Sequence, residues 1–489
     1  MPAGVCAPET TLGDVFGRHR RSMQLDTEIL ESEYKFSHKN FVNSTHRPLS
    51  RVASAVDPRP PSGEARSEHA ARCRAAARVR AAARSNSRRS IRRRASRGDM
   101  PMDFELTDDQ HAIEAAIERI CADFDDDYWL ERDRAGGFPH DFHRALADAG
   151  WLGVAMSPEY GGAGLGITEA ALMMRAISAS GAGLSGASAV HMNIFGLNPV
   201  QVFGSAEQKA RFLPPLIAGR DKACFAVTEP DAGLDTTHLK TQAVRDGDHY
   251  VLNGRKIWIS TAQVANKMLI IARTTPLERV AKPADGLSLF YADLDRSRVD
   301  VREIDKMGRR AVDSNLLFID DLRVPVADRI GDEGEGFRYL LHGLNPERIL
   351  IAAEAVGLGQ AALRHATRYA NERIVFGRPI GRNQAIQHPL ALAWMQLEAA
   401  HLMVLKAAAR YDAGLPCGAQ ANAAKYLAAE AAFGACQAAM ATLGGMGYAK
   451  EYHVERYLRE CMIPRVAPVS PQMILCFIAE KVLGLPKSY

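Results

Sequence analysis

The sequence contains no uninterrupted apolar run long enough to cross a membrane, although 47% of its 489 residues are hydrophobic. A spanning helix needs about 18 to 20 such residues in succession, so we expect no membrane span. The eight cysteines form no CxxC pair and no Cys/His cluster with the spacing of metal ligands. We therefore expect no metal site and a reducing compartment. No GxGxxG motif follows a predicted strand, which argues against a Rossmann dinucleotide site.

Excess positive charge is confined to the first hundred residues. Residues 1–99 hold 20 Lys and Arg against 10 Asp and Glu, which gives this segment a net charge of +10. Because the whole chain has a net charge of +4, residues 100–489 carry −6. A mildly acidic body is a poor match for a phosphate backbone, so we expect no nucleic-acid partner for the folded part.

The segment 1–99 is expected to be a disordered extension. Residues 66–97 consist mainly of Arg, Ala and Ser, with almost no aliphatic side chain that could form a core. Three interpretations stay open. Translation could begin at Met100 or Met102, so that the segment is not part of the natural protein; the segment could be a basic tail; or it could be a targeting sequence, against which its length and early glutamates count.

From residue 100 the pattern changes from helical to β and back to helical. Residues 100–222 are expected to form a helical domain that opens with a capping box at 107–110. Residues 223–335 are expected to form a β-domain, in which Asn253-Gly254 predicts the turn of a hairpin. Residues 336–489 suit an antiparallel helical bundle. Its helices are predicted at 349–373, 384–410, 418–443, 452–460 and 473–483.

Glu347 is the most informative single residue. It stands at the predicted start of a helical run, 349–363, that is otherwise largely apolar. A carboxylate enclosed by apolar residues is disfavoured as an anion, so its pKa should rise towards the range in which it can accept a proton. The alternative is a surface glutamate that complements the dipole at the start of a helix.

Four short motifs occur in one order between about residues 104 and 485. They are CFAVTEPDAGLD at 224–235, KIWIS at 256–260, Glu372-Arg373 with Phe376-Gly377 and Gln384, and GGMGY at 444–448 followed by Glu451, Arg456 and Glu460. Together they resemble the motifs of the acyl-CoA dehydrogenases. The resemblance implies an α+β multi-domain fold with an N-terminal helical domain, a central β-domain and a C-terminal four-helix bundle, which is the order that the periodicity predicts.

The resemblance also implies an activity. The family binds FAD non-covalently, forms homotetramers or homodimers, and oxidises an acyl-CoA thioester to the 2-enoyl-CoA, with electrons passing to an electron-transfer flavoprotein. Two alternatives on the same fold stay open: an oxidase-like flavoprotein that uses oxygen, and a non-catalytic, DNA-associated member. We expect a cytoplasmic protein, or one of the mitochondrial matrix if the source is eukaryotic.

The catalytic base is assigned through the same resemblance. Most of the family carries it in a loop after the second signature, where this sequence has Pro468, which cannot accept a proton. The isovaleryl-CoA and long-chain branches carry it on a helix of the C-terminal domain, followed by Arg, and Glu347-Arg348 matches that pair. Glu347 is therefore the expected base. Proline also lacks the N–H that the family uses at this loop, so either the loop shifts by one residue or another donor replaces it.

The remaining site residues follow from the positions of the motifs. Those expected to contact FAD are Phe225, Val227, Thr228, Trp258, Ser260, Arg373, Phe376, Gln384, Gly444 and Gly445. Arg373 and Gln384 belong to the segment that reaches the flavin of a neighbouring subunit. Those expected near the substrate are Leu234, Asn345 and Arg348. Three residues depart from the family pattern, namely Leu234, His238 and Ala441.

Overall fold

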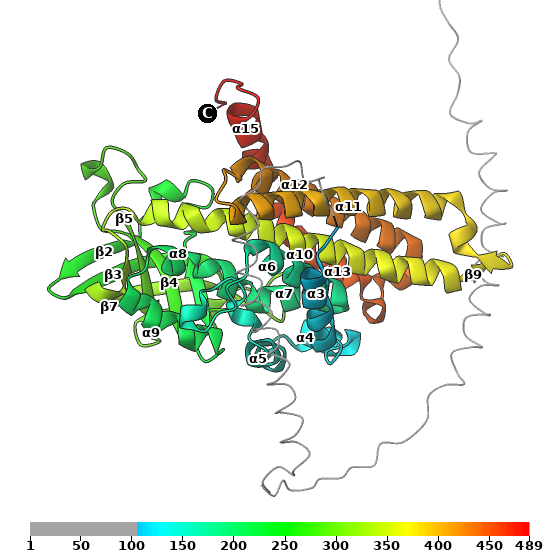
Figure 1. Ribbon diagram of the computed structural model, residues 1–489, viewed down its shortest axis with the longest axis horizontal. Helices are drawn as coiled ribbons and strands as arrows, with labels where there is room; N and C mark the ends of the chain where they lie inside the picture. The colour runs from blue at the N-terminus through cyan, green and yellow to red at the C-terminus, as the bar shows by residue number, and fades with distance from the viewer. Residues whose placement is uncertain (1–104, 489) are drawn as a thin grey trace, which may run out of the picture. The chain divides into compact units, whose positions relative to one another are not determined.

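The computed structural model describes residues 105–488, and the extension predicted for 1–99 lies outside this range. In the described part the helices of residues 108–217 come first, a β-sheet follows, and long helices complete the chain, as predicted (Figure 1). The sheet packs beside α8 and α9, while α10 and α11 run alongside α6, and α12 packs against α10 and α11.

The N-terminal helices begin at the predicted capping box. The Thr107 side chain accepts a hydrogen bond from the Gln110 N–H, and the Gln110 side chain accepts one from the Thr107 N–H. Ile113 and Ile117 then face the core, because they lie one turn apart on the same side of the helix. The helices are α3 (Asp108–Cys121), α4 (Asp126–Ala135), α5 (His140–Asp148), α6 (Ile167–Ile177), α7 (Gly183–His191), α8 (Asn198–Phe203) and α9 (Ala206–Ile217).

The central sheet has eight strands among the described residues, in the order β6-β7-β3-β2-β4-β5-β8, with β1 paired to β4. Its strands are β1 (Ala223–Ala226), β2 (Gln242–Asp246), β3 (His249–Ser260), β4 (Lys267–Arg273), β5 (Leu287–Asp293), β6 (Val299–Glu303), β7 (Ser314–Pro325) and β8 (Arg329–Ile330). Strands β4 and β5 are buried along most of their length, so this part of the sheet is covered on both faces.

The predicted hairpin turn at Asn253-Gly254 is wrong. Strand β3 continues through both residues, and the turn lies at Gly247, between β2 and β3. The pairing of β3 with β7 shifts register between Leu252 and Gly254, which marks a β-bulge. A Cβ at Gly254 would lie 2.5 Å from Thr241 Oγ1, so glycine is needed here for a close approach of two backbones rather than for a turn.

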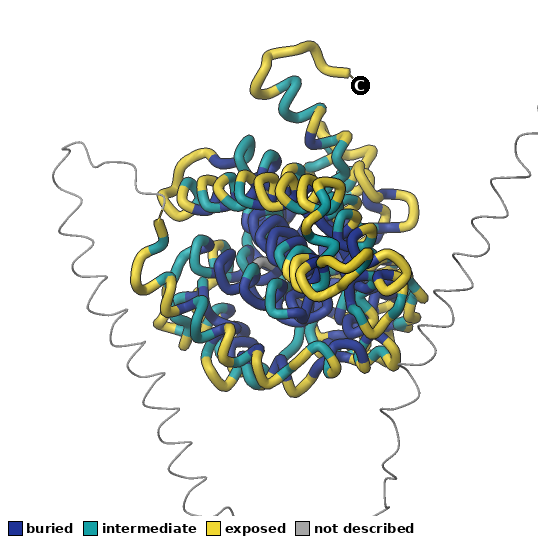
Figure 2. The backbone as a smooth tube through the Cα atoms, turned by 90° about the vertical axis from the view of Figure 1, so that its right-hand side faces the viewer, coloured by how far each residue is buried: buried dark blue, intermediate teal, exposed yellow. Residues whose placement is uncertain are grey.

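The C-terminal helices form the predicted bundle. Helix α10 passes so close to α6 that a Cβ on Gly357 would overlap the carbonyl group of Arg175. Figure 2 shows the buried segments at the centre and the exposed ones around them. The elements are α10 (Gly336–Glu372), β9 (Ile374–Val375), β10 (Arg378–Pro379), α11 (Gln384–Asp412), α12 (Gly418–Leu443), α13 (Val454–Glu460), α14 (Met462–Val466) and α15 (Pro471–Lys481).

Helix α10 begins thirteen residues earlier than predicted, at Gly336 rather than at residue 349. Glu347 therefore lies in the interior of a helix, and its predicted place at a helix start is wrong. Proline disfavours helix interiors, and Pro346 stands directly before Glu347. Here the proline is buried inside the helix, which continues past it to Glu372. A role for Glu347 in complementing a helix-start dipole is thereby removed.

One stretch bears on the expectation of no membrane span. Among the described residues, Val454–Lys481 is long and apolar enough to cross a membrane by length and composition alone. This is weak support for a span. The stretch is divided in the structure, because α14 ends at Val466 and α15 begins at Pro471.

Candidate functional site

Glu347 presents an enclosed carboxyl group from the middle of α10. The residue as a whole is partly buried, but within residues 105–488 its Oε2 atom is shielded from solvent and has no hydrogen-bond partner. Burial raises the pKa of this carboxyl from 4.5 to about 7, against the charges of His191 and Arg348, which lower it. A carboxylate with a pKa near neutrality is suited to accept a proton.

A buried histidine–glutamate pair accompanies this carboxyl group. His191, at the end of α7, makes a hydrogen bond through Nδ1 to Oε1 of Glu354, on α10. The Glu354 side chain is fully buried, and Oε2 has no hydrogen-bond partner among the described residues. Burial alone would lower the pKa of His191, but the charge and hydrogen bond of Glu354 reverse this, so that the pKa is raised.

Arg309 connects this pair to the sheet. Its guanidinium donates to Ser188 Oγ on α7 at 3.2 Å, to Ser260 Oγ on β3 at 2.8 Å and to Ser314 Oγ on β7 at 3.2 Å. Burial lowers the pKa of Arg309, while Glu354 acts in the opposite direction. Ser260, predicted to contact the cofactor, is therefore linked through Arg309 to α7, the helix that carries His191.

Arg348 and Asn345, predicted near the substrate, lie together beside Glu347. Arg348 donates to Asn345 Oδ1 at 3.2 Å, and its Nε atom is enclosed with no partner in the described range. Burial lowers the pKa of Arg348, and the Glu347 carboxyl opposes this shift. Leu234 lies on a different element, the loop after β1, where its side chain is 62% exposed.

The first signature is held in place by a buried ion pair. Lys256, on β3, donates from Nζ to Glu229 Oε1 at 2.9 Å and to the Val227 carbonyl at 3.1 Å. Glu229 also accepts from the N–H groups of Lys240 and Thr241, at 2.6 and 3.0 Å. These contacts close the loop 227–241 on itself and fix the segment that contains Val227 and Thr228.

The residues predicted around the flavin ring meet at this loop. The Ile257 N–H donates to the Thr228 carbonyl at 2.9 Å, so the first signature lies against β3. A register shift between Lys256 and Ile259 forms a bulge on β3, and Trp258 within it has φ of 62°. A bulge re-aims its side chain, and the Trp258 ring is 57% exposed. Phe225 packs nearby on β1, between two core clusters.

Another group of predicted residues lies elsewhere in the chain. Arg373 follows the end of α10, and 26 residues of helix separate it from Glu347, a rise of roughly 40 Å. Phe376 is 98% exposed beyond it, and Gln384 is exposed at the start of α11. Figure 1 shows β9, next to Phe376, at the end of the bundle away from the sheet. These residues therefore lie towards the other end of the bundle from Glu347 of the same chain.

Gly444 and Gly445 lie at the end of α12, and both are exposed. A Cβ at either position would meet no atom within 4 Å of the described chain. Open space on this scale beside a backbone allows a ligand or a second chain to approach closely.

The second signature supports α7, which carries His191. Glu460 accepts from the N–H groups of Leu184 and Ser185, at 2.7 and 3.2 Å, and from Ser185 Oγ at 2.6 Å. A carboxylate at the start of a helix complements the helix dipole. Arg456 donates to the Gly181 carbonyl at 2.7 Å, just before that helix. This signature therefore orients a helix whose far end lies beside the candidate base.

The loop at Pro468 is anchored by a buried lysine. Lys425, on α12, donates from Nζ to the Val469 carbonyl at 2.6 Å. Burial lowers the pKa of Lys425 to about 8. The peptide bond between Ala467 and Pro468 is cis.

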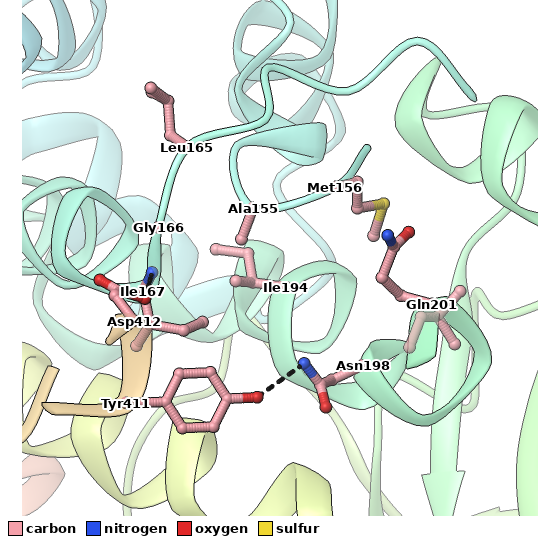
Figure 3. A pocket seen from close by; sticks show the side chains of 11 residues that line it. Ala155, Met156, Leu165, Gly166, Ile167, Ile194, Asn198, Gln201, Tyr411 and Asp412 are labelled. Carbon is pink, nitrogen blue, oxygen red and sulfur yellow. Dashed lines mark hydrogen bonds between the residues drawn. The ribbon is translucent and has the colours of Figure 1, made fainter. Parts of the chain in front are cut away.

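A small pocket lies apart from the predicted site residues. It has a volume of about 110 Å³, and its lining includes Asn198, Gln201, Tyr411 and Asp412 (Figure 3). Asn198 and Tyr411 point toward one another and share a hydrogen bond of 3.2 Å. None of the residues predicted from the motifs lines this pocket.

Comparison with known proteins identifies the fold. Family models of the acyl-CoA dehydrogenase N-terminal, middle and C-terminal domains match residues 107–220, 224–322 and 334–482. The chain belongs to the acyl-CoA dehydrogenase family. It is thus an oxidoreductase that acts on CH–CH bonds, and its cofactor is FAD, as the motifs predicted.

Relatives cover the same part of the chain. Acyl-CoA dehydrogenase fadE12 of Mycobacterium bovis is 36% identical over 395 residues, which are 79% of this chain and 99% of that protein. The solved structure of butyryl-CoA dehydrogenase from Megasphaera elsdenii has a TM-score of 0.74 at 30% identity and covers 78% of this chain and all of its own. A complex of PigA with FAD has a TM-score of 0.74 at 27% identity, with the same coverage.

The residues of this acyl-CoA dehydrogenase fit a flavin. An exposed indole re-aimed by a bulge offers a flat apolar surface for a ring system, and Thr228 and Ser260 lie on the segments next to it. Arg373 offers the planar fork that suits a phosphate group.

The motifs did not reveal His191, Glu354 or Arg309. A weak signal was available for Glu354, because it is a single acid within the Ala-rich stretch 352–355 of a helix predicted to be buried. The other two gave none, since His191 and Arg309 come from distant segments: His191 is brought to α10 by the packing of α7, and Arg309 reaches α7 through its bond to Ser188.

Proposed function

We propose that this protein is an FAD-dependent acyl-CoA dehydrogenase in which Glu347 removes the α-proton of the thioester substrate. The observation that carries the proposal is the enclosed and unpartnered Oε2 atom of Glu347, with a pKa of about 7. At neutral pH a substantial fraction of this carboxyl is ionised and can accept a proton. Bound FAD would supply the acceptor for the hydride from the β-carbon.

The other residues position the reactants. Trp258 and Thr228 support one side of the flavin ring system, and the Lys256–Glu229 pair fixes both of their segments. Arg348 lies next to the base on α10, where its charge favours the ionised form of Glu347. The product is a 2-enoyl-CoA, and electrons leave to an electron-transfer flavoprotein.

The test is an anaerobic titration of the holoprotein with straight, branched and aromatic acyl-CoAs. We expect at least one of them to bleach the flavin absorbance of the wild type. Glu347→Gln should retain FAD and lose the bleaching, because an amide cannot take the α-proton. Glu131→Gln, an exposed acid on α4, is the matched control and should bleach as the wild type does. Full bleaching of Glu347→Gln would refute the assignment of the base.

The electron acceptor is tested separately. With a bleached sample, reoxidation by electron-transfer flavoprotein without peroxide release supports the dehydrogenase. Stoichiometric peroxide on admission of air, with no transfer to the flavoprotein, would show the oxidase-like alternative instead.

We also propose that the protein works as a homo-oligomer. Helix α11 exposes Leu392, Trp394, Met395 and Leu402, each by about half, which is an apolar surface of the kind found at subunit interfaces. Phe376 and Arg373 would then reach the FAD of the second subunit.

A further inference from the structure

The interior beside Glu347 contains more ionisable groups than proton abstraction alone requires. Glu354 follows Glu347 by seven residues on α10, which places both side chains on one face of the helix, roughly 10 Å apart along its axis. His191 approaches this face from α7 and contacts Glu354. Both glutamates have an enclosed Oε2 atom with no partner in residues 105–488.

The surrounding charges come from three elements besides α7. Arg348, Glu347 and Glu354 lie on α10, Arg309 and Asp313 lie in the segment before β7, and Glu460 lies on α13. Arg309 opposes a charge on His191, whereas both glutamates of α10 favour it. Glu354 thus favours the protonated form of His191, by raising its pKa, and holds the ring against the face of α10 that carries the candidate base.

We propose that His191, held by Glu354, is a positioning residue that keeps Glu347 ionised and ready to take the α-proton. The inference deepens the proposed function and rests on it. An enclosed carboxylate is unstable without a nearby positive charge. Arg348 supplies one such charge along α10, and His191 supplies another from the facing helix. Glu354 neutralises the pair as a whole while keeping the histidine protonated.

Each variant should shift the pKa of Glu347 in the direction set by the charge that it removes. His191→Gln removes the cation and retains a side chain that can donate to Glu354, so Glu347 should hold its proton to higher pH. Replacing both His191 and Glu354 removes the attraction between His191 and the Glu347 carboxylate together with its repulsion by Glu354. Because His191 affects Glu347 more strongly than Glu354 does, the double variant His191→Gln/Glu354→Gln should fall between the single variant and the wild type.

The experiment is an infrared pH titration of the holoprotein. The difference between wild type and Glu347→Gln isolates the carboxylic C=O band of Glu347, and the same difference is taken in each variant background. We expect the midpoint to rise by about one pH unit in His191→Gln. The control is His143→Gln, which removes another buried histidine, on α5, away from any charged partner of Glu347. Its midpoint should equal that of the wild type.

Turnover gives a second readout. Below the midpoint, kcat/KM of His191→Gln should fall by about tenfold and recover in alkali, while the KM changes little. An unchanged infrared midpoint in His191→Gln, an equal rise in His143→Gln, or a loss of kcat that is uniform across pH would overturn the inference. The infrared titration needs no turnover. If no acyl-CoA bleaches the wild type, the proposed function fails while the titration still decides whether His191 acts on Glu347.

Discussion

At the scale of single residues, the burial of Glu347 lowers the stability of the folded protein. Glu347 has a pKa of about 7 in the folded chain against 4.5 for an exposed glutamate, because it is buried. Between these values the unfolded chain releases the proton and the folded chain keeps it, so stability falls as pH rises. Above about pH 7 the full cost is present, and it corresponds to about 3 kcal/mol.

This reasoning predicts that Glu347→Gln stabilises the protein in alkali. Gln has nearly the same shape and never ionises, so the variant should unfold at a higher temperature than the wild type at about pH 8 and at nearly the same temperature at about pH 5. Thermal unfolding of both proteins at the two pH values measures this. Glu131→Gln, whose carboxyl is exposed, should show no such dependence on pH. A difference that is the same at both values would count against burial as the cause.

At the scale of elements, the loop 227–241 and strand β3 depend on one buried contact. Lys256 is fully buried, and burial lowers its pKa to about 8 although Glu229 opposes the shift. Lys240, in the same loop, pairs with Asp231, and both of these side chains are largely exposed. Both lysines pair with a carboxylate, but the Lys256–Glu229 pair is buried and the Lys240–Asp231 pair is exposed.

We predict that Lys256→Met destabilises the protein by about 3–5 kcal/mol, because it leaves Glu229 buried without its cation. Lys240→Met should cost less than about 1 kcal/mol, since water screens an exposed pair. Urea unfolding followed by release of FAD measures both. Lys256→Met should also lose FAD first, because Trp258 and Thr228 are fixed by that contact. Equal costs for the two variants would show that burial does not decide the strength of the pair.

Elements with a strong local signal could be predicted from the sequence, whereas contacts between segments could not. The capping box at Thr107 and the helix Gly418–Leu443 have the predicted bounds, because caps and periodicity are local. Asn253-Gly254 misled the prediction, since a bulge uses the same residues as a turn, and the start of α10 at Gly336 was missed. Glu347 was found as a candidate base, but His191 was not.

At the scale of the whole molecule, one chain does not hold all the residues predicted to contact one FAD. Glu347 lies in the first half of α10 and Arg373 lies beyond its end, roughly 40 Å from Glu347 along the helix. In a symmetric dimer each FAD site would be completed by the other chain, which would supply Arg373 and Phe376. The near-complete exposure of Phe376 supports such an exchange.

This arrangement predicts complementation between two inactive variants. Glu347→Gln lacks the base, and Arg373→Ala should bind FAD poorly, so each should be inactive alone. In a hybrid dimer one site combines both defects, while the other has an intact Glu347 from one chain and an intact Arg373 from the other. In the purified hybrid about half of all sites should then be active. Co-expression with two different tags and assay of the doubly purified hybrid measures this. If Glu347 and Arg373 of one chain belonged to the same FAD site, every site of the hybrid would contain one defect, and the hybrid would be inactive.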